Sequence, residues 1–100
     1  MPLVETPLDK LSNSALDAIE AGQYYQAESR GRKLLRKYPK ALDGHDRMAH
    51  LRTVQGRFRE AVNHYDKLLA MAQKDPTLAD PETIQYFIEK RDEARAQVDE

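Results

Sequence analysis

The sequence predicts an all-α fold of about five helices, and three observations lead to this prediction. Apolar residues recur every three or four positions along most of the chain, which is the spacing of one helix face. No segment of useful length alternates apolar and polar residues as a half-buried β-strand would. Proline and glycine stand mainly where these periodic segments begin and end.

The first two helices are expected on either side of Gly22. The segment Thr6-Pro7-Leu8-Asp9 begins the first helix with a capping residue, a proline at the first helical position and an acid three residues after the cap. Gly22 ends the apolar pattern, and the second helix is expected to end at Pro39. The apolar face of the first helix is Leu8, Leu11, Ala15, Ala18 and Ile19. The face of the second is Ala27, Gly31, Leu34, Leu35 and Tyr38.

Three further helices are expected in the second half of the chain. The third spans about 41–55, the fourth ends near Gln73, and the last spans about 81–98. Asp80 is expected to cap the last helix, with Pro81 in its first turn. The apolar residues of these helices are, in order, Met48, Ala49, Leu51 and Val54; Ala61, Tyr65, Leu68, Leu69 and Ala72; and Ile84, Phe87, Ile88, Ala94 and Val98.

The sequence repeats itself with a period of 34 residues. The matching pairs are Gly22 and Gly56, Tyr24 and Phe58, Ala27 and Ala61, Leu34 and Leu68, and Leu35 and Leu69. Each glycine can adopt the left-handed conformation that ends a helix, and each alanine lets two helices approach closely. The aromatic residue is expected to fill the space between the two helices. Because a helical hairpin cannot bury its apolar face alone, the two hairpins are expected to stack.

On these features the chain resembles the tetratricopeptide repeat family. Tyr65, four residues beyond Ala61, and Pro39, twelve beyond Ala27, add to the likeness. The first helix of each repeat departs from the Trp-x-x-Leu-Gly-x-x-Tyr pattern of the family, and Gly31 replaces the aromatic residue matched by Tyr65. The resemblance implies a short α-solenoid of stacked antiparallel hairpins, in one domain that covers residues 1–100. Its parts would be repeat one (about 8–41), repeat two (about 42–75) and a capping helix (about 81–98).

The resemblance also implies a non-enzymatic adaptor that binds a peptide or helix of a partner protein. In this family ligands lie along the concave groove formed by the first helix of each repeat. The matching positions here are Asp9, Asn13, Leu16, Glu20, Asp43, Arg47, His50, Val54, Glu82, Tyr86 and Glu89. Because acids outnumber bases in this set, a basic or apolar partner segment is expected. Some members clamp the C-terminal carboxylate of chaperones with Lys, Asn and Arg, but Ser12, Leu16, Arg47, Glu82 and Tyr86 stand at those positions.

Two other functions are compatible with this sequence. The first is self-association, because two repeats and a cap are few for independent stability. Tyr25 and Tyr86 lie off the apolar faces and are candidates for burial in a homodimer. The second is a regulatory domain of a larger assembly, such as a bacterial transcription regulator, acting through a partner protein.

A second candidate surface is the basic segment 30–40, which contains no acid. Its basic residues are Arg30, Arg32, Lys33, Arg36, Lys37 and Lys40. Because Leu34 and Leu35 belong to the core, these charges are expected on the outward, convex side of the second helix. They form either a solvated surface or a contact for an acidic protein, an anionic membrane or nucleic acid. Nucleic acid is the least favoured, since the formal net charge is −1 and Tyr38 belongs to the core.

Neither a catalytic site nor a metal or cofactor site is expected. A catalytic centre needs a base, a nucleophile and an orienting group in one pocket. The three histidines, His45, His50 and His64, form no i, i+4 metal pair. His64 is expected on the outer surface and His50 on the inner face of its helix.

Location is inferred from the absence of membrane, secretory and disulfide features. No apolar run approaches the roughly 20 residues that span a bilayer. The N-terminus lacks the features of a secretory signal, and the chain contains no cysteine. A cytoplasmic protein is therefore expected.

Overall fold

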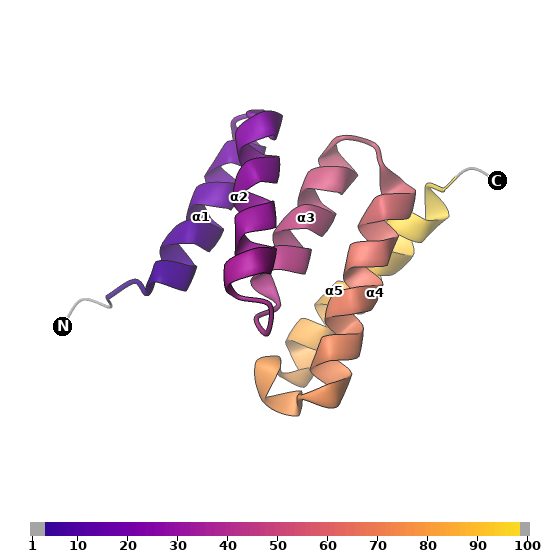
Figure 1. Cartoon of the computed structure of the whole chain (residues 1–100). Coiled ribbons are helices and arrows are strands. Elements are labelled where there is room, and N and C mark those ends of the chain that lie inside the picture. Colours follow the sequence, from indigo (N-terminus) through magenta and orange to yellow (C-terminus); the bar gives the residue numbers. More distant parts are fainter. Residues whose placement is uncertain (1–3, 99–100) are drawn as a thin grey trace.

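Five α-helices and one short 3-10 helix follow one another in the computed structural model, which describes residues 4–98 (Figure 1). The elements are α1 (Pro7–Glu20), α2 (Tyr24–Lys37), α3 (Asp43–Val54), α4 (Phe58–Lys74), η1 (Pro76–Leu78) and α5 (Pro81–Ala96). No strand occurs in this part of the chain. The predicted all-α fold is therefore confirmed. The ends differ by up to two residues from expectation, since α3 begins at Asp43 and α5 ends at Ala96.

Local side-chain hydrogen bonds begin the first and last helices, as expected. Thr6 and Asp9 form a capping box: the Thr6 hydroxyl accepts from the Asp9 N–H at 3.0 Å, and the Asp9 carboxylate accepts from the Thr6 N–H at 3.3 Å. At α5 the Asp80 carboxylate accepts from the Thr83 N–H at 2.7 Å. Each cap satisfies a backbone N–H that has no partner within its own helix.

Both glycine turns have the same backbone geometry. Gly22 and Gly56 have φ angles of 72° and 73°, and no other described residue has positive φ. After α1 the Gln23 N–H donates to the Ala18 carbonyl at 2.8 Å. After α3 the Arg57 N–H donates to the Arg52 carbonyl at 2.7 Å. This six-to-one bond is the mark of a Schellman motif, which requires left-handed backbone at the glycine position.

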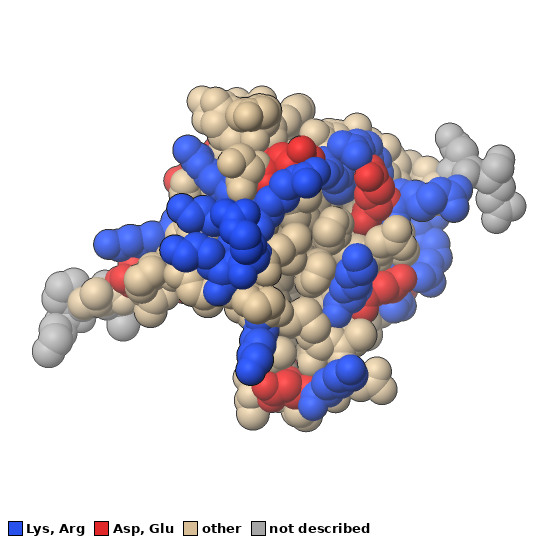
Figure 2. Space-filling view, in the orientation of Figure 1, with Lys and Arg blue, Asp and Glu red and all other residues tan. Residues whose placement is uncertain are grey.

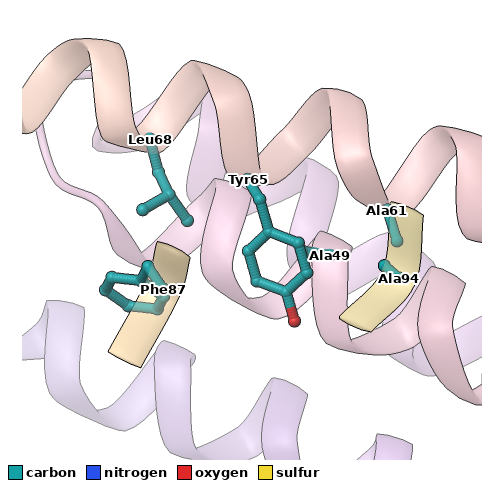
Figure 3. Close-up of a cluster of buried hydrophobic side chains, with 6 residues drawn as sticks. All are labelled: Ala49, Ala61, Tyr65, Leu68, Phe87 and Ala94. Carbon is teal, nitrogen blue, oxygen red and sulfur yellow. The ribbon is translucent and has the colours of Figure 1, made fainter. Parts of the chain in front are cut away.

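Neighbouring helices in the sequence pack against each other, from α1 on α2 through to α4 on α5, and α1 also packs on α3 (Figure 1). One buried cluster joins α1, α2 and α3, and consists of Ala18, Ile19, Ala27, Met48 and Leu51. A second joins α3, α4 and α5. In Figure 3 the side chains of Ala61, Tyr65 and Leu68 on α4 face Ala49, Phe87 and Ala94. The last helix therefore completes the core of the second hairpin.

The alanine pair of the repeat is buried as predicted, but the aromatic pair is not uniform. Ala27 is 1% exposed and Ala61 is fully buried. Phe58 is half-buried against the second cluster. Tyr24, at the matching position, is 40% exposed, so the expectation that it fills the space between its helices is wrong.

Two further glycines allow α2 and α3 to approach each other closely. A Cβ at Gly31, the position that matches Tyr65 in the 34-residue repeat, would overlap the Met48 side chain. A Cβ at Gly44 would lie 2.6 Å from Leu35 Cδ2 and 3.1 Å from the Leu35 backbone nitrogen. The replacement of the aromatic residue by Gly31 is therefore matched by a large residue on the facing helix.

The left-handed backbone at Gly56 predicts a cost for β-branched residues that does not depend on packing. A Cβ at this position would meet no atom within 4 Å, so any destabilisation comes from φ. We expect Gly56→Val to lower the free energy of unfolding by about 1–3 kcal/mol, measured by urea denaturation. Gly56→Asn is the control, because asparagine tolerates this conformation, and it should cost less. Equal stability of the valine variant and the parent would contradict the turn assignment.

The close contact at Ala61 predicts that a larger side chain will be poorly tolerated there. Ala61→Leu should overpack the α3–α4–α5 cluster and lower the unfolding free energy by roughly 1–3 kcal/mol. Ala70 is an exposed alanine on the same helix, so Ala70→Leu tests the effect of leucine without the burial. Thermal unfolding followed by circular dichroism should separate the two variants. Similar melting temperatures for both would rule out close approach as the role of Ala61.

Candidate functional site

An open cavity of about 850 Å³ is lined by residues of α1, α3, α4 and α5. From α3 come Asp46, Arg47, His50, Thr53 and Val54; from α5 come Tyr86, Lys90, Glu93 and Ala94, and Gln97 directly follows that helix. Leu16 of α1 and Phe58 and Tyr65 of α4 complete the lining. Val54 is 45% exposed and Tyr86 is 53% exposed, which leaves apolar surface available at this cavity. Its volume lies in the range of ligand-binding clefts.

Five of the predicted groove residues line this cavity: Leu16, Arg47, His50, Val54 and Tyr86. The other predicted positions are not among the lining residues; they are Asp9, Asn13, Glu20, Asp43, Glu82 and Glu89. Three of these make local hydrogen bonds instead. Asp9 is part of the α1 cap, Asn13 donates to the Glu5 carboxylate at 3.0 Å, and Glu89 accepts from the Gln85 amide at 3.3 Å.

Sequence reasoning missed five polar residues of the cavity: Asp46, Thr53, Lys90, Glu93 and Gln97. On α5 the reason is that the helix is rotated about its own axis relative to the orientation expected from the sequence. Phe87 and Ala94 are its buried residues, whereas Ile84 and Ile88 are only half-buried. This orientation places Tyr86, Lys90 and Glu93 at the cavity. The i, i+7 pair of Phe87 and Ala94 marks the buried side of α5, but it does not show which flank of the helix meets the cavity.

Arg47 serves the structure as well as the cavity. Its Nε donates to the Ser12 carbonyl and to the Ser12 hydroxyl, each at 3.1 Å, and so connects α3 to α1. Its Nη1 lies 3.5 Å from the Asp46 carboxylate. Burial raises the pKa of Asp46, and the charge of Arg47 partly offsets that rise. The Arg47 guanidinium is therefore held in place before any partner binds.

The α5 wall of the cavity combines an aromatic ring with charges of both signs. The Lys90 ammonium lies 5.5 Å from the centre of the Tyr86 ring, within the range of a cation–π interaction. It also lies 3.5 Å from the Glu93 carboxylate. The cavity thus holds two acids, Asp46 and Glu93, opposite two bases, Arg47 and Lys90. Its charge is balanced, unlike that of the set predicted from the sequence.

Histidine and acidic side chains are the groups in residues 4–98 from which a metal site could be built. No group of three or more His, Asp or Glu side chains in this range is placed to hold a metal ion. The cavity offers exposed apolar surface with a few fixed polar groups.

His45 and His64 form a pair between α3 and α4, so the expectation that His64 lies on the outer surface is wrong. Their Nδ1 atoms are 3.0 Å apart and their ring centres 5.2 Å apart, and both side chains are partly buried. One ring must donate and the other accept, which requires at least one neutral histidine. Burial lowers the pKa of His45 and lowers that of His64 to about 4, with further lowering by Lys67 at both.

Arg52 is a buried charge that the sequence did not reveal. Arg52 is only 5% exposed. Its guanidinium donates one hydrogen bond to the Glu28 carboxylate of α2 and another, of 2.9 Å, to Gln55 Oε1. The hydrogen bond from Arg52 lowers the pKa of Glu28. Because removing one partner of a buried ion pair leaves an uncompensated charge, this pair holds α2 and α3 in one arrangement.

The predicted basic segment lies on α2 and its C-terminal turn, and Figure 2 shows Lys and Arg side chains gathered over that helix. Two of its members have partners: Arg30 donates to the Ser14 carbonyl at 3.0 Å, and Arg32 lies 3.5 Å from Glu28. Lys33, Arg36, Lys37 and Lys40 are exposed. Arg30 therefore connects α2 to α1, while the remaining residues present charge outward.

The histidine pair predicts that stability declines in mild acid. Both histidines have a lower pKa when folded than when unfolded, so the unfolded chain takes up more protons as pH falls below about 6.5. We expect the free energy of unfolding to fall by on the order of 1 kcal/mol between about pH 7.5 and about pH 5.5. Carboxyl groups titrate mainly below this window, although Asp46 has the opposite sign because its pKa is raised.

A double variant, His45→Gln/His64→Gln, provides the check on this decline. Urea denaturation of parent and variant at both pH values should give a smaller pH dependence for the variant. If the variant and parent decline equally, the pair is not the source of the acid sensitivity.

No helix within residues 4–98 is long and apolar enough to cross a membrane. In comparisons with known proteins, no protein-family model, no curated protein and no solved structure matches the chain.

Proposed function

We propose that this chain is a non-enzymatic adaptor of tetratricopeptide-repeat type, which binds an apolar or basic segment of a partner protein at the cavity. The observation that carries the proposal is the exposed apolar surface of Val54 and Tyr86 beside a cleft of about 850 Å³. A fixed aromatic side chain at the edge of a cleft is a common anchor of protein interfaces. The charged groups around it, which pair with each other, would form the rim.

The repeat-type assignment is supported by local geometry rather than by overall likeness to any known protein. Gly22 and Gly56 have nearly the same φ, and each is followed by the same six-to-one hydrogen bond. Ala27 and Ala61 are both buried at helix contacts. Two units of 34 residues that share a turn and a buried small residue are typical of this repeat.

The partner segment that fits best is an apolar side-chain cluster, in a peptide or a helix, with flanking basic residues. The cavity itself is balanced between two acids and two bases, so it provides no net preference for charge. Acids that do not line it but belong to the same helices, such as Glu20, Asp43 and Glu82, would favour basic residues at the edges. The cavity would therefore select mainly for apolar side chains of the partner, and the surrounding acids would add a weaker preference for basic residues beside them.

Self-association is a second candidate, because exposed tyrosines occur in two places. Tyr25 is 87% exposed and Tyr86 is 53% exposed. Burial of both in a dimer would add apolar contact to a small core. The experiment below separates this function from partner binding.

Loss of the apolar anchor should abolish partner capture. We expect Val54→Ser/Tyr86→Ser to bind a captured partner at least about tenfold more weakly than the parent, because both side chains contribute to one interface. Immobilised protein would be used for quantitative capture from extract, and titration with the purified partner would give the Kd. Tyr25→Ser is the matched control, because it removes another exposed tyrosine, on a helix that does not line the cavity.

The outcomes distinguish the candidates. Proteins that bind the parent and the Tyr25→Ser control, but not the double variant, support the cavity as the binding site. Equal capture by all three forms would exclude it. A dimer by light scattering that dissociates in both the Tyr25 and the Tyr86 variants would establish self-association instead.

A further inference from the structure

The outward face of α2 carries a stripe of exposed cations that the fold does not require. The cationic stripe consists of Arg32, Lys33, Arg36 and Lys37 on α2 and of Lys40 just beyond its C-terminal end. Only Arg32 has a carboxylate within 4 Å among residues 4–98, namely Glu28. The segment 30–40 contains six of the 16 basic residues of the chain and none of its 17 acids. Charge is therefore strongly segregated in a chain with a formal net charge of −1.

Folding alone gives no reason for this arrangement. Arg32 and Arg36, and likewise Lys33 and Lys37, stand four residues apart on one helix, where like charges destabilise the helix by a few tenths of a kcal/mol per pair. Lysine and arginine in the last turn do favour the helix dipole, but this effect falls off within that turn. Arg30 differs, because its bond to the Ser14 carbonyl connects two helices. Arg36 and Lys37 thus gain some stabilisation from the helix dipole and Arg32 has an ion pair with Glu28, but repulsion between the like charges offsets these local gains.

Apolar surface lies at both ends of the cationic stripe. At its C-terminal end an open hollow of about 540 Å³ is lined by Lys37, Tyr38, Pro39, Lys40, Ala41 and Leu78. Here two lysines stand beside side chains that are otherwise apolar or aromatic. At the N-terminal end, Tyr25 is 87% exposed and shares a helix face with Arg32 and Arg36, seven and eleven residues further on. Tyrosine is enriched where protein meets the headgroup region of a membrane.

We propose that this face of α2 adsorbs to an anionic phospholipid bilayer. A bilayer surface presents many negative headgroups in a plane, and each exposed Lys or Arg near it strengthens adsorption about fivefold. The apolar hollow and Tyr25 add contacts with the acyl layer just beneath the headgroups. Polyanions other than lipid bilayers have no such apolar layer. The cations attract the headgroups, and the apolar ends select a lipid surface over other polyanions.

Other anionic partners fit this surface less well. An acidic peptide binds most effectively in a groove that orders its backbone, whereas the stripe follows the outer face of a single helix. Single-stranded nucleic acid is held by aromatic rings among the cations, but Tyr38 is half-buried. Tyr25 lies about two turns from the nearest cation of the stripe.

The proposed membrane face leaves the cavity free. No residue of α2 lines that cavity, so a bilayer on the outer face of α2 does not occupy it. The inference therefore does not depend on the proposed adaptor function. Adsorption and partner capture can be tested, and can fail, separately.

Vesicle sedimentation tests the proposal with the full chain. The parent should bind vesicles of phosphatidylcholine with about 30% phosphatidylserine and show little binding to pure phosphatidylcholine. Raising the salt from about 0.1 M to about 0.5 M should release it, since screening weakens these contacts. Lys33→Gln/Arg36→Gln/Lys37→Gln should weaken binding about a hundredfold, from about fivefold for each lost charge.

A second triple variant gives the matched control. Lys10→Gln/Lys67→Gln/Lys74→Gln removes the same number of charges from exposed positions elsewhere. It should bind anionic vesicles within a few-fold of the parent, and circular dichroism should show all three forms to be folded. Equal losses in the two triple variants, or equal binding to neutral vesicles, would overturn the proposal. So would tighter binding to a short DNA duplex or to polyglutamate than to the anionic vesicles.

Discussion

The structure depends above all on two glycines that reverse the chain through left-handed backbone. Gly22 and Gly56 have positive φ, and the hydrogen bond that closes each turn brings the next helix back along the previous one. Only then do Ala27 and Ala61 face the preceding helix and become buried. The order of helix contacts follows, because each hairpin exposes an apolar face that the next helix must cover. A local backbone constraint thus determines the pattern of long-range packing.

Small residues and satisfied polar groups then fix how the hairpins meet. Gly31 and Gly44 allow α2 and α3 to approach closely. The side chains of Met48 and Leu35 then occupy the space that a Cβ at Gly31 or Gly44 would need. Close approach also buries Arg52, whose guanidinium donates a hydrogen bond to the Glu28 carboxylate on α2. No buried side-chain nitrogen or oxygen atom in the described residues lacks a hydrogen-bond partner. Since an unpaired buried charge is costly, sliding one hairpin over the other would lose both packing and polar contacts.

Features that depend on nearby residues could be predicted from the sequence, and features that depend on helix rotation could not. The Thr6 cap and the turn at Gly56 rest on residues within one helical turn, which a single sequence displays directly. The contact between His45 and His64 requires the relative rotation of two helices. Lys90 and Glu93 on α5 were missed for the same reason, because the apolar residues of that helix are spread widely around its axis and define no single face.

Charge segregation lets the two candidate surfaces act independently. The cationic stripe lies on α2, whereas the cavity is lined by residues of the other four α-helices. At physiological ionic strength the Debye length is about 8 Å, so salt weakens the field that the exposed charges of the stripe exert on a partner bound elsewhere. The acids and bases of the cavity itself therefore decide which charges a partner segment can bring there. The stripe contributes to this choice only at low salt, where its field extends through the molecule.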